Sequence, residues 1–159
     1  MPLADAPHRI GDDSERLPAW QPWAALAAAS LGLHFVWEML QAPLYQGMLT
    51  MPLSGATRVC AQASAGDAVI TLAAYALVAF AVRSRAWMTH PRVGHIAAYL
   101  AIGLAVTIAL EYLNVYGLGR WSYSAAMPRV LGVGLAPLAQ WIIVPIVILW
   151  FMRRYLRRR

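Results

Sequence analysis

The sequence predicts an all-α protein, a bundle of four membrane-crossing helices with both termini in the cytoplasm. Of its 159 residues, 60% are apolar and only 13% are charged, against about 45–50% and about 25% in ordinary globular domains. It also contains four apolar runs of membrane-spanning length, and its arginines are divided unequally between the two sides that four spans define. So small a chain could not bury this much apolar surface in water, which excludes a soluble enzyme or a disordered chain.

The four apolar runs predict four transmembrane helices. Each has close to the roughly 20 residues that cross a hydrocarbon core of about 30 Å, and a backbone in lipid must satisfy its own hydrogen bonds. The expected spans are 23–42, 65–82, 95–113 and 130–152, within a membrane domain at 20–152. Small residues four apart, Ala28 with Gly32 and Gly132 with Ala136, predict close helix approaches. Residues 1–19 are polar and predict a flexible tail, and residues 153–159 predict an arginine-rich cytoplasmic tail.

The orientation follows from the basic residues, which are 13 arginines and no lysine. Ten of them fall on the side that holds both termini and the connection between the second and third spans. Arg58, Arg120 and Arg129 fall on the other side. This asymmetry predicts cytoplasmic termini and a multi-pass protein of a cell membrane, with a bacterial inner membrane as the expected location. The arginine-rich C-terminal end lies next to aromatic residues, a combination that predicts an anchor for lipid headgroups. We therefore expect membrane lipids, and no nucleic acid, as partners.

Three acids remain in the apolar part of the chain: Glu38, Asp67 and Glu111. The topology places all three in the outer half of the membrane, with Glu38 about 8 Å below the outer end of its helix. A charged side chain at the bilayer centre costs at least about 2.5–3.5 kcal/mol, so these groups should point into the bundle.

Each acid has a structural interpretation beside the functional one. Asp67 lies at the expected start of the 65–82 helix, where an acid caps the helix N-terminus. Glu111 lies near a helix C-terminus, where a pairing with Arg120 would offset the unfavourable dipole. Glu38 is the deepest and is flanked by apolar residues, which favours a functional role.

Helical spacing adds polar partners to the acids. His34, Glu38 and Gln41 share one helix face, as do Glu111 and Asn114. Gln140 lies about 15 Å below the outer end of the last span. The simpler interpretation of both Gln140 and His34 is that they form hydrogen bonds between helices. The candidate catalytic residues are Glu38, Asp67 and Glu111. The candidate substrate-binding residues are His34, Trp37, Gln41, Tyr112, Asn114, Arg120, Trp121, Tyr123, Gln140 and Trp141.

We expect no cofactor and no metal. A bis-histidine haem is disfavoured because His34 and His95 differ in depth by about 15 Å. Structural zinc needs four Cys or His ligands close together, and the sequence contains no such cluster. A carboxylate-rich metal site that uses His34 remains an alternative by ligand type.

One segment resembles a known family. HFVWEMLQAPLY, residues 34–45, resembles the first-helix W-E element of small integral-membrane terpene cyclases. The resemblance implies that Glu38 protonates a lipophilic substrate, and that Asp67 or Glu111 is the second functional acid. Members of that family have more than four helices, so a complete pocket here would require a homo-oligomer.

Two functions from different classes follow. In the first, an outer-leaflet pocket of buried carboxylates holds a lipophilic, isoprenoid-like molecule, and Glu38 acts as general acid of a cyclase or isomerase. Such chemistry is plausible because a carboxyl group held away from water resists ionisation and can deliver a proton. In the second, the chain is a transport or assembly subunit whose carboxylates form structural or gating ion pairs.

Overall fold

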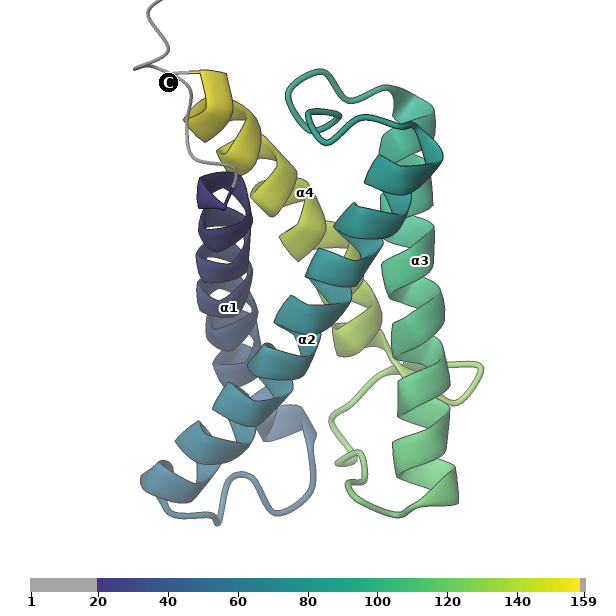
Figure 1. Cartoon of the computed structure of the whole chain (residues 1–159). Coiled ribbons are helices and arrows are strands. Elements are labelled where there is room, and N and C mark those ends of the chain that lie inside the picture. The colour runs from purple at the N-terminus through teal and green to yellow at the C-terminus, as the bar shows by residue number, and fades with distance from the viewer. Residues whose placement is uncertain (1–19, 158–159) are drawn as a thin grey trace, which may run out of the picture.

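The computed structural model describes residues 20–157, which form a bundle of four long helices (Figure 1). The helices are α1 (Gln21–Gln41), α2 (Leu53–Ala81), α3 (Val93–Tyr112) and α4 (Leu135–Arg157). A 3-10 turn, η2 (Ala42–Leu44), follows α1, and a π-helical turn, η3 (Leu113–Gly117), continues α3. The strands β1 (Arg129–Val130) and β2 (Val133–Gly134) form a short antiparallel pair. The predicted all-α four-helix bundle is confirmed.

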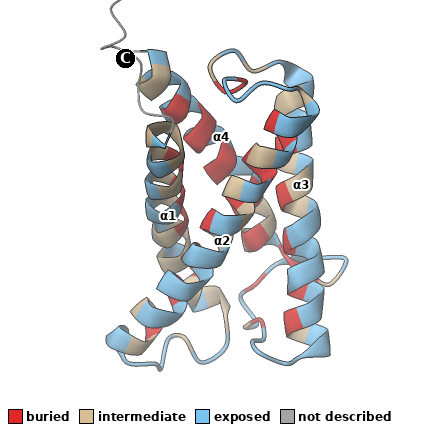
Figure 2. Ribbon diagram, viewed as in Figure 1, coloured by how far each residue is buried: buried red, intermediate tan, exposed pale blue. Residues whose placement is uncertain are grey.

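All four helices are long and apolar enough to cross a membrane. Their outward faces are exposed (Figure 2) although many of the side chains there are large and apolar. These exposed apolar side chains include Leu31, Leu40, Val69, Phe80, Ile143 and Trp150. An apolar surface that surrounds the whole bundle matches lipid rather than water as its solvent. The chain is therefore a multi-pass membrane protein.

The two ends of the bundle differ in what they carry. The start of α1, the 82–92 connection and the end of α4 lie together at one end (Figure 1). We call this the arginine end, because among residues 20–157 it carries Arg83, Arg85, Arg92, Arg153, Arg154 and Arg157. The 42–52 and 118–134 connections lie at the opposite end, which we call the loop end. The arginine asymmetry alone predicts which end faces the cytoplasm.

Helix α2 begins earlier than the expected start at residue 65. It starts at Leu53, so Asp67 lies in the helix interior and its interpretation as an N-cap is wrong. The buried face of the first turns consists of Ala56, Cys60 and Ser64, each four residues from the next. Small side chains with this spacing suit close helix contact. Arg58 and Gln62 interrupt the apolar run here and concealed the start of the helix in the sequence.

The other helix boundaries differ less. Helix α4 begins at Leu135 rather than at residue 130, because residues 129–134 form the β1–β2 pair. It continues to Arg157, so most of the expected 153–159 tail is helical. The expected flexible tail at 1–19 lies outside the described residues.

The interior at the arginine end is apolar. Trp87 and Met88, from the 82–92 connection, are 2% and 1% exposed and insert between the helices. The Trp87 ring stacks on Tyr75 and meets Tyr99 edge-on, and its Nε1 donates to the Tyr75 carbonyl at 3.3 Å. The Tyr75 hydroxyl in turn donates to the Arg85 carbonyl at 2.5 Å. The connection is thereby fixed to the helices. Helical residues complete this core: Leu26, Ala74, Val78, Ala79, Val144, Ile148, Leu149 and Met152.

A tight contact between α3 and α4 lies at Gly103, which small-residue spacing did not predict. A Cβ atom on Gly103 of α3 would lie 2.1 Å from Cε3 of Trp141 of α4, so only glycine fits there. At Gly32, by contrast, an added Cβ would meet nothing within 4 Å, and Gly132 lies in the β1–β2 turn with φ 84°. The close contacts expected at Gly32 and Gly132 are therefore not helix–helix contacts. The Gly103 contact places the Trp141 ring in the bundle interior.

Candidate functional site

Polar side chains fill the interior of the bundle where α1, α2 and α4 meet, toward the loop end. Helix α1 supplies the His34, Glu38 and Gln41 face that helical spacing predicted. Helix α2 supplies Asp67 and α4 supplies Gln140. His34 is fully buried, and Gln41 and Gln140 are nearly so. We call this group, together with Thr71, the polar network.

Gln140 is the centre of the polar network. Its side-chain nitrogen lies 3.1 Å from Glu38 Oε1, 2.9 Å from Asp67 Oδ2 and 2.9 Å from His34 Nδ1. These three partners come from two different helices, and Gln140 comes from a third. One amide group therefore connects both carboxyl groups with the imidazole.

Gln41 connects Glu38 to Gln140 a second time. The Gln41 side-chain nitrogen donates to Glu38 Oε1 at 2.8 Å and to Gln140 Oε1 at 3.2 Å. Trp37 Nε1 donates to Gln41 Oε1 at 3.1 Å. These bonds fix the Glu38 carboxyl group, and they place the Trp37 indole at the edge of the network.

His34 extends the network toward the middle of the bundle. Its Nδ1 lies 3.5 Å from Asp67 Oδ2, and its Nε2 lies 3.3 Å from Thr71 Oγ1. The Trp141 ring, held against Gly103, lies 5.3 Å from the imidazole, centroid to centroid. Thr71 lies four residues after Asp67 and therefore on the same face of α2. That spacing could have identified Thr71 from the sequence.

The number of available N–H hydrogens limits which hydrogen bonds the polar network can form at one time. A side-chain amide has two N–H hydrogens, yet three possible acceptors surround the Gln140 nitrogen. His34 Nδ1 lies nearer to the Gln140 nitrogen, at 2.9 Å, than to Asp67 Oδ2, at 3.5 Å, and the amide can donate to only two of its three neighbours at one time. Glu38 Oε1 and Asp67 Oδ2 lie 3.1 and 2.9 Å from the same Gln140 nitrogen, so the two carboxyl groups lie close together. Two carboxyl groups this close in a buried site disfavour double ionisation.

Glu111 lies in a second polar group, formed by the end of α3 and the 118–134 connection. Glu111 Oε2 accepts a hydrogen bond from the Tyr123 hydroxyl and another from Trp121 Nε1 at 3.5 Å. Arg120 donates instead to Asn114 Oδ1 at 3.3 Å. The expected pairing of Glu111 with Arg120 is therefore replaced by pairing with neutral donors. Asn114 lies in the π-helical turn η3, a deviation from regular helix that is frequent at functional sites.

Tyr45 lies between the polar network and the Glu111 group. Its ring lies 5.7 Å from the ring of Tyr123, whose hydroxyl donates to Glu111. Burial, and then the charge of Glu111, raise the pKa of Tyr45 well above its usual value. Burial, and then the bond to Glu111, likewise raise the pKa of Tyr123. Both phenols therefore keep their hydrogens, and Tyr123 donates its hydrogen to Glu111.

Main-chain pairing holds these two tyrosines together. Tyr45 and Tyr123 form an antiparallel bridge, so the 42–52 connection is joined to the 118–134 connection. The Gln46 N–H donates to the Ser122 carbonyl, and the Ser124 N–H to the Leu44 carbonyl, each at 2.9 Å. Contacts between two connections far apart in the sequence could not be predicted from helical spacing.

The structure divides the predicted site residues among three places. The polar network contains or adjoins His34, Trp37, Glu38, Gln41, Asp67, Gln140 and Trp141. The Glu111 group contains Asn114, Arg120, Trp121 and Tyr123. Tyr112 belongs to neither, because it is 43% exposed and donates to the Leu131 carbonyl. Thr71 was not among the predicted residues.

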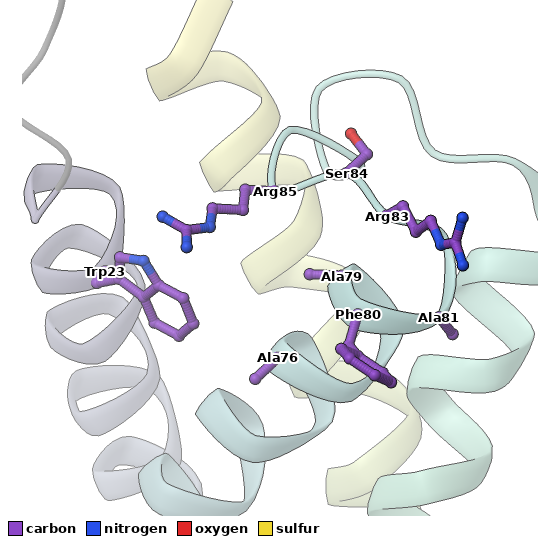
Figure 3. Close-up of a pocket in the computed structure, with 8 residues that line it drawn as sticks. All are labelled: Trp23, Ala76, Ala79, Phe80, Ala81, Arg83, Ser84 and Arg85. Atoms are coloured by element: carbon purple, nitrogen blue, oxygen red, sulfur yellow. The ribbon is translucent and has the colours of Figure 1, made fainter.

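A cavity lies at the other end of the molecule. It has a volume of about 600 Å³ and is lined by residues of α1, α2 and the 82–92 connection at the arginine end (Figure 3). None of Glu38, Asp67 and Glu111 lines it. Within residues 20–157, no group of three or more His, Cys, Asp or Glu side chains is arranged to hold a metal ion.

Comparison with known protein families, with curated proteins and with solved structures gives no match. A function for the polar network must therefore be argued from its geometry and chemistry. The site brings together two carboxyl groups from different helices, beside an imidazole and two indole rings.

Proposed function

We propose that this protein is a membrane-embedded acid/base enzyme of the cyclase or isomerase type, with Glu38 as general acid toward a lipophilic, isoprenoid-like substrate. The observation that carries the proposal is the convergence of Glu38 and Asp67 on the Gln140 nitrogen, at 3.1 and 2.9 Å. Two carboxyl groups this close in a dry interior resist double ionisation, so one can hold a proton to donate while the other accepts one.

The proposed reaction conserves the atoms of the substrate. The Glu38 carboxyl proton bonds to one carbon of a C=C double bond, whose π electrons form the new C–H bond and leave a cation on the neighbouring carbon. In cyclisation, a second double bond of the same molecule attacks that cation and forms a C–C bond. An adjacent carbon then loses a proton to a carboxylate, Asp67 or Glu111. The proton count is restored, and no oxidant or reductant is needed.

The surroundings of Glu38 suit a cationic intermediate. The Trp37 and Trp141 indoles adjoin the polar network, and aromatic faces attract cations. Glu38 is only partly covered, whereas His34 and Gln140 are buried. Of the network's proton carriers, Glu38 is thus better placed than His34 to meet a molecule that arrives from the lipid. The W-E resemblance at Trp37 and Glu38 supports the same role.

The membrane setting completes the proposal. With the arginine end in the cytoplasm, as the positive-inside rule predicts, the polar network lies in the outer half of the bilayer. The Glu111 group, through Tyr45, would supply the second acid. A bundle of four helices presents Glu38 near its surface, so the substrate pocket would be completed by a second copy of the chain.

Deuterium transfer tests the proposal. The protein is produced in a host that accumulates linear polyprenyl hydrocarbons, its membranes are incubated in D₂O, and the extracted lipids are analysed by mass spectrometry. The Glu38 proton exchanges with solvent, so each isomerised or cyclised product should carry one deuterium on carbon. E38Q should abolish this product, whereas E38D, which keeps a carboxyl group, should retain part of it.

The same measurement can also contradict the proposed role of Glu38. Equal product from E38Q and wild type, with E38Q folded normally, would contradict the role of Glu38. A protein that yields no deuterated product in any variant, but loses a bound partner subunit or a transport activity in E38Q, would instead be the transport or assembly subunit.

A further inference from the structure

At the arginine end, we infer that the groove between α1 and α2 is a binding site for the headgroup of an anionic phospholipid. The groove is the cavity of about 600 Å³ shown in Figure 3. Its lining comprises Trp23 of α1, Ala76, Ala79, Phe80 and Ala81 of α2, and Arg83, Ser84 and Arg85 of the following turn. This inference does not depend on the proposed enzyme activity.

The arrangement of the lining residues matches a lipid with a charged head. Figure 3 shows Arg85 extending across the gap toward Trp23, whereas Arg83 points away from Trp23. One guanidinium group therefore faces the groove, with an indole on the opposite wall. Guanidinium binds phosphate oxygens strongly, and tryptophan favours the headgroup level of a membrane.

Charge complementarity selects an anion as the occupant. The carboxylates of the described residues, Glu38, Asp67 and Glu111, belong to the polar network and the Glu111 group toward the loop end. None of them forms an ion pair with Arg85. The arginine end thus lacks a described acid that could neutralise its six guanidinium groups. Basic groups at this depth attract anionic lipid headgroups.

The apolar part of the groove suits an acyl chain. Ala76 and Ala79 leave space next to α1, and Phe80 is 83% exposed beside them. These residues lie in the last turns of a membrane-spanning helix, so lipid is the solvent that surrounds them. A phosphate at Arg85 would leave the acyl chains of the same molecule along this wall.

The backbone of the turn permits a substitution at Arg83 that keeps the turn itself. Arg83 has φ 52°, a conformation that favours glycine. The Ser84 N–H donates to the Ala79 carbonyl at 3.0 Å and the Arg83 N–H to the Phe80 carbonyl at 3.2 Å, which is the pattern that ends helices with glycine at this position. The Arg83 side chain points away from Trp23 (Figure 3), so its cation lies at the edge of the groove. The R83G variant removes that cation and relieves the strain.

The test measures lipid binding to the full chain in a neutral detergent. Native mass spectrometry is used to compare dioleoyl phosphatidylglycerol with dioleoyl phosphatidylcholine at equal concentrations. Wild type should bind phosphatidylglycerol more tightly, and R85Q should weaken that binding about fivefold, the factor that about 1 kcal/mol per interfacial arginine gives. R83G should weaken it by a smaller factor without a lower melting temperature.

The matched control is R154Q, which removes one charge at the same end. Arg154 stacks on the Trp150 ring at 4.8 Å and does not line the groove. R154Q should therefore bind phosphatidylglycerol as wild type does. An equal loss in R154Q and R85Q would overturn the site, because charge alone would then explain the binding.

Two further experiments test which molecule occupies the groove. Inorganic phosphate that displaces phosphatidylglycerol at millimolar concentration would show a free-anion site and contradict the lipid assignment. The N-terminal segment carries Asp5, Asp12, Asp13 and Glu15. If a chain that lacks residues 2–19 binds phosphatidylglycerol and the full chain does not, the occupant is this acidic segment and the inference is wrong.

Discussion

The two ends of the bundle bury different kinds of side chain, although the same four helices form both. At the arginine end, Trp87, Met88 and Tyr99 pack among aliphatic residues, and their burial needs few hydrogen bonds. Toward the loop end, the interior consists of His34, Gln140 and carboxyl groups connected by hydrogen bonds.

This difference indicates that the apolar interior stabilises the protein and that the polar interior serves its function. Apolar side chains of similar volume would fill the loop-end interior at equal or lower free energy, because buried ionisable groups lose their hydration. The polar network is therefore not explained by stability. The apolar end should tolerate truncation poorly, and the polar end should tolerate changes that preserve its shape and hydrogen bonds.

The largest expected effect is on the apolar end. W87A removes a side chain that is 2% exposed and contacts Tyr75 and Tyr99, and should lower the free energy of unfolding by about 3–4 kcal/mol. Reversible unfolding by SDS in mixed micelles measures this change. W150A is the control, because Trp150 is 58% exposed and its loss should cost less than about 1 kcal/mol. Equal effects of the two substitutions would contradict the assignment of the core.

The next effect is expected where the two ends meet, at the contact between α3 and α4. G103A introduces a Cβ 2.1 Å from Trp141, a clash that the buried ring cannot avoid without moving away from His34. The free energy of unfolding should fall by about 2–3 kcal/mol. G32A is the matched control in α1, where the added Cβ meets nothing within 4 Å, so it should be neutral or stabilising by about 0.5–1 kcal/mol. A stable G103A protein would show that the two helices do not approach this closely.

A smaller loss is expected from the centre of the polar network. Q140A removes the amide that donates to Glu38 and Asp67, and leaves their oxygens and the Gln41 N–H without that partner. The cost should be about 2 kcal/mol in the same unfolding measurement. Q62A is the control, because Gln62 is exposed on α2. If Q140A and Q62A behave alike, the hydrogen bonds of Gln140 do not hold the three helices together.

The sequence predicted the helices better than their contacts, for a physical reason. Lipid requires long apolar helices, so hydropathy alone identified four spans. The polar residues Arg58 and Gln62 interrupt the apolar run and concealed the first turns of α2, and with them the interior position of Asp67.

The candidate site was predictable within one helix and less so between helices. Spacing placed His34, Glu38 and Gln41 on one face, but no periodicity in the sequence joins Gln140 to Asp67 or Tyr123 to Glu111. Those contacts depend on how α4 crosses the bundle and on how the 42–52 and 118–134 connections pair. Both are products of tertiary packing.

The smallest effect on stability should accompany the largest effect on function. E38Q keeps the shape of the side chain and an oxygen that accepts from Gln41 and Gln140, so unfolding should change by less than about 0.5 kcal/mol. What E38Q removes is the proton. E38L, which removes the acceptor too, leaves those two amides without a partner and should cost about 1–2 kcal/mol. An E38Q protein as unstable as E38L would show that the carboxyl group is needed for folding. A stable E38Q protein would mean that Glu38 is present for its proton, which is what distinguishes the polar end of this bundle from the apolar one.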